Sequence, residues 1–360
     1  MKRILTVLFL TFCAFLVFAT PSLAFDADSF FDEYEEIHPD GAFDPERVGD
    51  ETDAAEIFRM VGDAFSDGLP GAVSFFAMLV GIAAVYAASE SFIERISEGS
   101  ARLTSSAISA ISSTLIISRL LPLALSVRTG MQEMSAFFSG LLPIAAGILA
   151  AGGSVNSAAT QAFNMSLTLG VIEYAATELL MPLVFAMLAL SVTAGLGAGT
   201  VSTLARWIKS VFAWLLGIFT TVIIGSVSMQ SMISAAKDSA YLRGAKYAAS
   251  GMIPVVGGVV SGALSSLAGG LAYVKSVIGV SAVFVIVSIA LTPLITLLLY
   301  RVSLSLAGSL IELLSGDGGG GCFRSFRSAL DALIAVYSLT ALCAIFEIFV
   351  FMKSGVEILG

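Results

Sequence analysis

Long apolar runs separated by short polar stretches fill the chain from residue 71 onward. Several runs reach the roughly 20 residues that an α-helix needs to cross the hydrocarbon core of a bilayer. A large soluble core can also be apolar, but it would not leave eight such runs with short loops between them. The pattern predicts an all-α fold, a polytopic transmembrane helical bundle with about seven to eight spans. The candidate spans are residues 71–89, 104–127, 137–153, 178–198, 211–230, 252–273, 277–300 and 330–352.

Two stretches depart from a plain apolar run. The run 104–127 contains Arg119 and Pro122, so it either packs its arginine inward or is a broken helix. In residues 154–177, Glu173 and two side-chain amides interrupt an otherwise apolar sequence. We expect that region to be re-entrant or interfacial and not a full crossing.

The first 24 residues have the layout of a cleavable secretory signal peptide. Lys2 and Arg3 form a positive start, residues 4–19 form an apolar core, and residues 22–24 form a small-x-small cleavage site. The alternative is an uncleaved first membrane helix. Either way, the segment that follows is expected on the outer side of the membrane.

Residues 25–70 form an acidic extracytoplasmic segment ahead of the multipass domain 71–360. This segment carries a local net charge of −13, whereas the multipass domain carries +2. Asp53 with Glu56 resembles a helix capping box and predicts a short interfacial helix ahead of Pro70. The segment either docks a partner or is a solvated, partly disordered linker.

Composition supports the membrane interpretation and excludes several kinds of chemistry. Charged residues make up 12% of the chain, against about 25% in ordinary soluble domains. The charge distribution gives no nucleic-acid surface. The single histidine, His38, and three cysteines form no metal site or catalytic set. The glycine run 316–321 has no following Lys-Ser/Thr, so it is no phosphate loop. We expect neither an enzyme nor a cofactor.

Four ionisable residues are predicted at membrane depth: Arg119, Glu173, Glu178 and Glu347. Charges in lipid are costly and usually face protein or water, so each is a functional candidate. The alternatives are interfacial positions for Glu173 and Glu178, a snorkelling Arg119, and a helix-packing contact for Glu347. We hypothesise that Arg119 pairs with one of the glutamates.

Residues 231–262 combine charge, proline and small residues between two apolar spans. The pattern predicts a charged surface helix followed by a helix that enters the membrane. Gly258 and Gly262 are four residues apart, so they share a helix face and allow a neighbouring backbone to approach. The candidate functional or packing residues here are Arg243, Lys246, Pro254, Gly257, Gly258 and Gly262.

The distribution of Lys and Arg predicts an orientation, because cytoplasmic loops are enriched in them. With the acidic segment outside, the loops 90–103, 231–251 and 301–329 lie inside and hold eight bases. Five bases, including Arg206 and Lys209, then fall outside.

The stretch from Ser239 to Ser315 resembles the stage III sporulation protein AE family of endospore-forming bacteria. The resemblance rests on residues spaced along this stretch: Arg243, Lys246, Ile253-Pro254-Val255-Val256-Gly257-Gly258, Leu271, Lys275, Gly279 and the run LTPLITLLLYR at 291–301. A leader and several spans fit the same family over the whole length.

The resemblance implies a multipass protein of the mother-cell membrane that surrounds the forespore. It would be a subunit of a channel or secretion-like complex needed for late forespore development. The implied partners are membrane lipid, other proteins of the same sporulation operon including an ATPase, and a forespore-side channel protein. The rivals are a stand-alone secondary transporter or permease that uses the buried Arg and Glu residues, and a purely structural membrane anchor.

Overall fold

The computed structural model describes residues 52–93, 98–151, 155–194, 203–221, 225, 257–315 and 320–353. All of these residues are helical, which confirms the all-α prediction. The predicted signal peptide, residues 25–51 and the charged stretch 231–251 lie outside the described residues.

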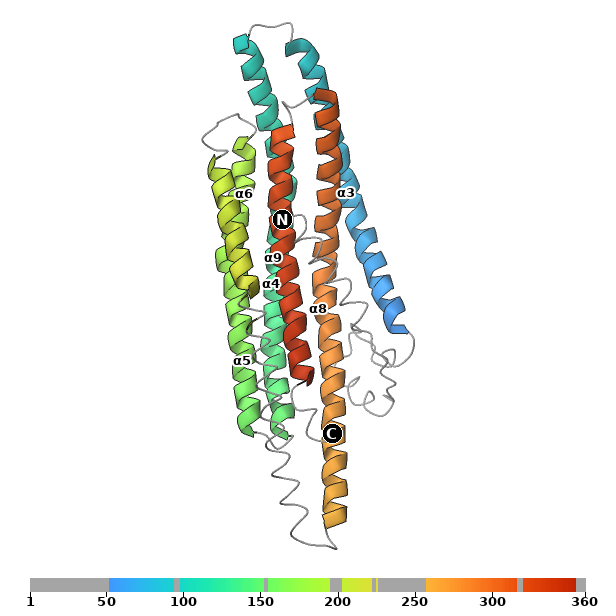
Figure 1. Cartoon of the computed structure of the whole chain (residues 1–360). Coiled ribbons are helices and arrows are strands. Elements are labelled where there is room, and N and C mark those ends of the chain that lie inside the picture. Colours follow the sequence, from blue (N-terminus) through green and yellow to red (C-terminus); the bar gives the residue numbers. More distant parts are fainter. Residues whose placement is uncertain are drawn as a thin grey trace.

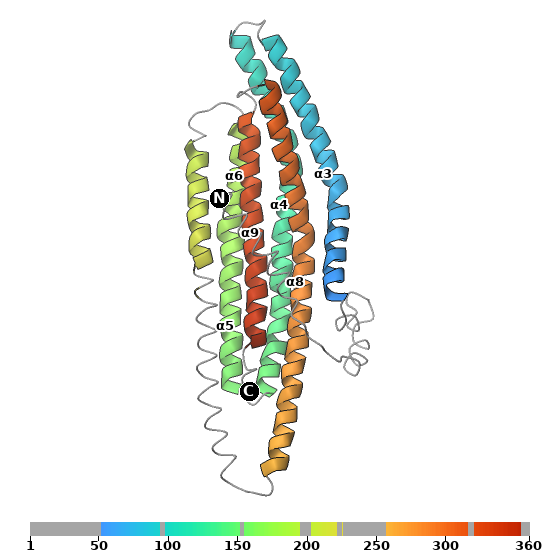
Figure 2. The same ribbon diagram turned by 45° about the vertical axis from the view of Figure 1, so that its right-hand side comes forward.

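The helices run side by side along one axis and form an elongated bundle (Figures 1 and 2). The named elements are α3 (Thr52–Ile93), α4 (Glu98–Ala151), α5 (Val155–Tyr174), the π-helix η2 (Ala175–Leu180), α6 (Met181–Ala194), α8 (Gly257–Ser315) and α9 (Gly320–Lys353). Within the described residues, five helical stretches are long and apolar enough to cross a membrane: Arg59–Ser89, Leu103–Ile148, Ala162–Thr193, Val277–Leu314 and Gly321–Met352. The chain is therefore a multispan membrane protein.

Helix α9 lies at the centre of the bundle. Buried residues make up 89% of its apolar window, against 33–50% in the four other spanning stretches. The exposed side of those four helices is itself apolar, with Val85, Ile111 and Leu167 all more than half exposed. Helices with apolar outer faces around a buried one are what a lipid environment favours.

Four of the predicted spans merge in pairs. Of the predicted spans, residues 104–127 and 137–151 belong to the single helix α4, and residues 257–273 and 277–300 belong to the single helix α8. The predicted count of spans is therefore wrong for these segments. Residues such as Arg128, Gln132 and Glu133 are polar, but they are good helix formers, so a loss of apolarity there does not end the helix.

The re-entrant or interfacial assignment of residues 154–177 is also wrong. Helix α5 passes through η2 into α6 without a break, and the spanning stretch is Ala162–Thr193. As a consequence, the helix over 203–221 begins towards the end of the bundle at which α8 ends and α9 begins (Figure 2). The predicted order of spans had put Arg206 and Lys209 on the opposite side.

The start of the first membrane helix differs from prediction as well. Helix α3 begins at Thr52, so Asp53 lies in its first turn instead of capping it, and the helix continues through Pro70. Within the described residues 52–70, no separate interfacial helix precedes Pro70. Helix α4 likewise continues through Pro122, where a break was one of the two expected outcomes.

Proline in a helix removes one N–H and leaves the carbonyl four residues earlier without its usual donor. In α8, Pro293 frees the carbonyl of Ile289. The hydroxyl of the fully buried Tyr337 on α9 donates to this carbonyl at 3.0 Å. Because lipid offers no water to a free carbonyl, this bond stabilises an otherwise unfavourable proline.

Candidate functional site

Two polar contacts join α4 to the neighbouring helix α5–η2–α6. The Nη2 atom of Arg128 lies 3.9 Å from Oε1 of Glu178. Farther along α4, the hydroxyl of Ser135 donates to Oε2 of Glu173 at 2.5 Å. The helices are antiparallel, so the two contacts lie one above the other along the same interface.

The π-helix explains how both glutamates reach α4. In an α-helix, residues five apart point about 140° away from each other. In η2, the N–H of Met181 instead bonds to the carbonyl of Ala176, five residues earlier. This wider turn brings Glu173 and Glu178 round to the same side. Such single π-turns are frequent at functional sites.

These residues form what we call the α4–η2 polar face. On α4, residues 128, 132, 135 and 139 follow the i, i+4, i+7, i+11 spacing of one helix face. The members of the face are Arg128, Gln132, Ser135, Ser139, Glu173 and Glu178.

The α4–η2 polar face lies on the outside of the bundle. The side chains of Arg128 and Glu178 are 42% and 56% exposed, and the contact of Ser135 with Glu173 is also exposed. All of these residues lie within the stretches Leu103–Ile148 and Ala162–Thr193. An outward charge within a membrane span requires a water-filled or protein environment.

The structure brings together two of the predicted charged residues and separates a third. Glu173 and Glu178 share the polar face, but the ionic partner of Glu178 is Arg128 and not Arg119. Arg119 is exposed on α4, nine residues before Arg128. The predicted pairing is therefore wrong for Glu178. It failed because Arg128 had been assigned to a loop between two spans.

Glu347 is fully buried on α9. Lys275 of α8 is 4% exposed, and its Nζ atom lies 5.2 Å above the ring of Phe351. Phe351 is one helical turn after Glu347, so the two residues share a helix face. Buried groups of opposite charge thus lie in the same interface.

The remaining predicted site residues fall at or before the start of α8. Gly257, Gly258 and Gly262 lie in its first two turns. Arg243, Lys246 and Pro254 lie outside the described residues.

Sequence reasoning missed the ion pair between Arg301 of α8 and Asp331 of α9. These side chains are 27% and 17% exposed, and both lie within spanning stretches. The signal was present, because Asp331 falls inside the predicted span 330–352 and Arg301 directly follows the span 277–300.

Comparison with known proteins gives a family match over most of the chain. The family described as stage III sporulation protein AE matches residues 46–355. A protein named Stage III sporulation protein AE, from Bacillus subtilis (strain 168), is 26% identical over 186 residues. That alignment spans 51% of this chain and 47% of the relative, so the chain matches about half of the relative's length. No solved structure matches the chain.

Proposed function

This chain belongs to the stage III sporulation protein AE family and therefore has a role in sporulation; we propose that it is an integral membrane subunit of a larger complex. That complex is a multiprotein channel or secretion-like apparatus that joins mother cell and forespore. In this proposal it lies in the mother-cell membrane around the forespore. Its partners are other proteins of the same sporulation operon, including an ATPase, and a forespore-side channel protein. The chain binds the other subunits within the membrane, and the ATPase supplies the energy that the complex uses.

The α4–η2 polar face is the observation that supports a subunit of a larger assembly. A charged side chain at the centre of a membrane helix costs about 2.5 to 3.5 kcal/mol on insertion scales. Arg128 and Glu178 sit about half exposed on the outside of this bundle. Another subunit, or a water-filled passage between subunits, removes that cost.

Charge reversal at this face tests the proposal in a sporulating host that lacks its own family member. Arg128→Glu or Glu178→Arg alone places like charges about as close as the native pair, 3.9 Å apart. We expect each single variant to lower the yield of heat-resistant spores, and the double variant to restore much of it. Immunoblotting of the membrane fraction verifies that every variant accumulates.

The matched control is the pair Arg59 and Asp63 near the start of α3. Its atoms are also 3.9 Å apart, but the side chains are 69% and 73% exposed and follow the common i, i+4 spacing. Reversal of this pair should leave spore yield unchanged.

A photo-crosslinker at Ser139, on the polar face, should form a covalent adduct with a protein of the same operon or with a second copy of the chain during sporulation. The same group at Val85, on the apolar outer side of α3, should react with lipid. Crosslinking of Ser139 to lipid alone would show that nothing covers the polar face and would defeat the proposal.

A further inference from the structure

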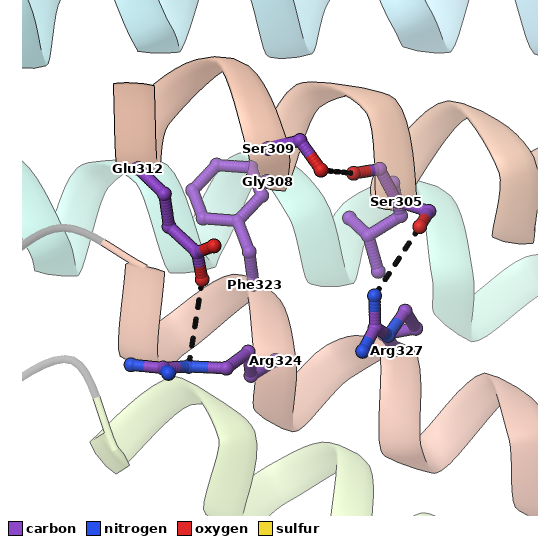
Figure 3. A pocket seen from close by; sticks show the side chains of 8 residues that line it. Ser305, Gly308, Ser309, Glu312, Phe323, Arg324 and Arg327 are labelled. Atoms are coloured by element: carbon purple, nitrogen blue, oxygen red, sulfur yellow. Dashed lines mark hydrogen bonds and ion pairs between the residues drawn. The ribbon is translucent and has the colours of Figure 1, made fainter. Parts of the chain in front are cut away.

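A pocket of about 230 Å³ opens between the last turns of α8 and the first turns of α9. It lies close to the α8–α9 turn, where the two helices leave the apolar stretches Val277–Leu314 and Gly321–Met352. The residues that define its chemistry are Ser305, Ser309, Glu312, Phe323, Arg324 and Arg327 (Figure 3).

The two arginines of this pocket both project from α9, three residues apart, and each contacts a side chain of α8. Nη1 of Arg327 donates to the hydroxyl of Ser305 at 3.2 Å, and Nε of Arg324 lies 3.8 Å from Oε1 of Glu312 (Figure 3). The second contact is long, and its side chains are 58% and 45% exposed. Such a long, exposed pair is weak, so Arg324 can exchange Glu312 for a stronger acceptor.

The lining carries two positive charges and one negative charge, which leaves a net positive pocket. A guanidinium presents a planar fork of N–H donors that matches the oxygens of a phosphate group. The hydroxyls of Ser305 and Ser309 add further groups that bind phosphate oxygens.

An apolar strip on α8 lies beside the face of that helix that lines the pocket. Val302, Leu306 and Leu313 are 51%, 54% and 83% exposed, and their spacing of four and seven residues puts them on one helix face. That face adjoins the one that carries Ser305 and Ser309. Val302 and Leu306 lie deeper in the spanning stretch than the arginines do. A ligand with a phosphate head and an apolar tail matches both parts, whereas free phosphate matches only the first.

We propose that this α8–α9 pocket binds an anionic phospholipid, with the headgroup phosphate held by Arg324 and Arg327 and an acyl chain along Val302 and Leu306. Basic pockets between membrane helices near the cytoplasmic surface are suited to such headgroups. The inference concerns the protein's lipid contacts and stands independently of the complex proposed above.

Native mass spectrometry of the full-length protein in detergent tests this proposal by titration with phosphatidylglycerol, phosphatidylethanolamine and glycerol 3-phosphate. We expect phosphatidylglycerol to bind more tightly than phosphatidylethanolamine. Glycerol 3-phosphate, which has no acyl chains, should neither bind detectably nor compete. Since each basic residue near a membrane surface contributes about 1 kcal/mol, the variant Arg324→Gln/Arg327→Gln should bind phosphatidylglycerol about 30-fold more weakly.

Glu312→Gln should act in the opposite direction, because it removes the carboxylate that competes for Arg324. We expect it to raise the affinity for phosphatidylglycerol. Misfolding of the variant could lower this affinity but could not raise it, so a gain cannot be attributed to misfolding. Arg206→Gln/Lys209→Gln is the matched control. It also removes two exposed positive charges towards the same end of the bundle, and it should leave binding unchanged.

Three results would overturn the proposal. The first is equal affinity for the two phospholipids. The second is an equal loss of affinity in the control variant, which would indicate general surface charge. The third is tight binding of glycerol 3-phosphate, which would indicate a site for a soluble phosphate compound.

Discussion

Tyr337 contacts two helices besides its own. Its hydroxyl bonds to the carbonyl of Ile289 on α8. On α4, a Cβ atom added at Gly130 would come within 2.6 Å of the same hydroxyl oxygen. Gly130 is thus the residue that lets the ring lie against the backbone of α4, and Pro293 is the residue that makes its hydroxyl necessary. Four residues from three helices depend on one another at this point.

A double-mutant cycle tests this dependence. Tyr337→Phe should lower the free energy of unfolding by about 1 kcal/mol, because the carbonyl of Ile289 loses its donor. In a Pro293→Ala background the restored N–H of residue 293 takes over that carbonyl, so the same change should have little effect. Denaturant unfolding in detergent, followed by circular dichroism, measures both. Tyr174→Phe, at a 61% exposed ring, is the control.

A similar loss in both backgrounds would contradict this account. It would mean that the hydroxyl of Tyr337 stabilises the bundle through some other contact, and that Pro293 is not the reason for its presence.

At the residue scale, the sequence identified charged residues within the membrane stretches better than it identified their partners. Glu173 and Glu178 were singled out, and both lie on the polar face. Their partners on α4 were missed, because neither Arg128 nor Ser135 falls within a predicted span. The turn in η2 that aligns the two glutamates was also unpredictable, since i→i+5 hydrogen bonding leaves no distinct pattern in a single apolar sequence.

At the scale of the helix, the apolar pattern predicted where membrane segments lie but not where they end. Residues 128–136 lower the local hydropathy without the Gly-Pro or Asn-Gly signals that mark a turn. The backbone therefore continues as α4. Hydropathy reports the solvent that a segment prefers, whereas helix termination depends on propensity and capping. The all-α class could therefore be predicted from hydropathy, whereas the span boundaries required helix propensity and capping.

The ion pair between Arg301 and Asp331 belongs to this scale, because it joins α8 to α9. Asp331→Asn leaves a largely buried guanidinium without its carboxylate, so we expect the free energy of unfolding to fall by about 2 to 3 kcal/mol. Reversal of both charges, Arg301→Asp with Asp331→Arg, should recover part of the loss. Thermal unfolding in detergent measures the change.

The comparison for this prediction is Asp63→Asn, which breaks the exposed pair with Arg59 on α3. An exposed pair contributes at most about 1 kcal/mol. If both asparagine variants lose the same small amount, the α8–α9 pair does not stabilise the helix interface.

For the whole molecule, the bases are unevenly divided between the two ends of the bundle. The end of α3, the start of α4, the start of the 203–221 helix, the end of α8 and the start of α9 all lie towards one end (Figures 1 and 2). The bases near this end are Arg102, Arg206, Lys209, Arg324 and Arg327, whereas Arg59 and Lys353 lie towards the other. Because Lys and Arg are enriched in cytoplasmic loops, we expect the first end to face the cytoplasm.

Single cysteines test this orientation in a background without Cys13, Cys322 and Cys343. Cysteines at Ser100 and Gly321, which are both exposed, should react with a membrane-impermeant maleimide only after the cytoplasmic side is opened. A cysteine at Asp63 should react in intact cells. Labelling of Ser100 and Gly321 from opposite sides would contradict the bundle arrangement itself, and labelling of both from outside would contradict only its orientation.

Among the described spanning stretches, the most deeply buried one, in α9, also comes after the other four in the chain. Chains are synthesised from the N-terminus, and membrane helices insert before they pack together. During translation the earlier spanning helices therefore stand in the bilayer around an unfilled centre until residues 320–353 emerge. A nascent or prematurely terminated chain lacks the surface against which its other helices pack, which makes it a ready substrate for membrane quality-control proteases.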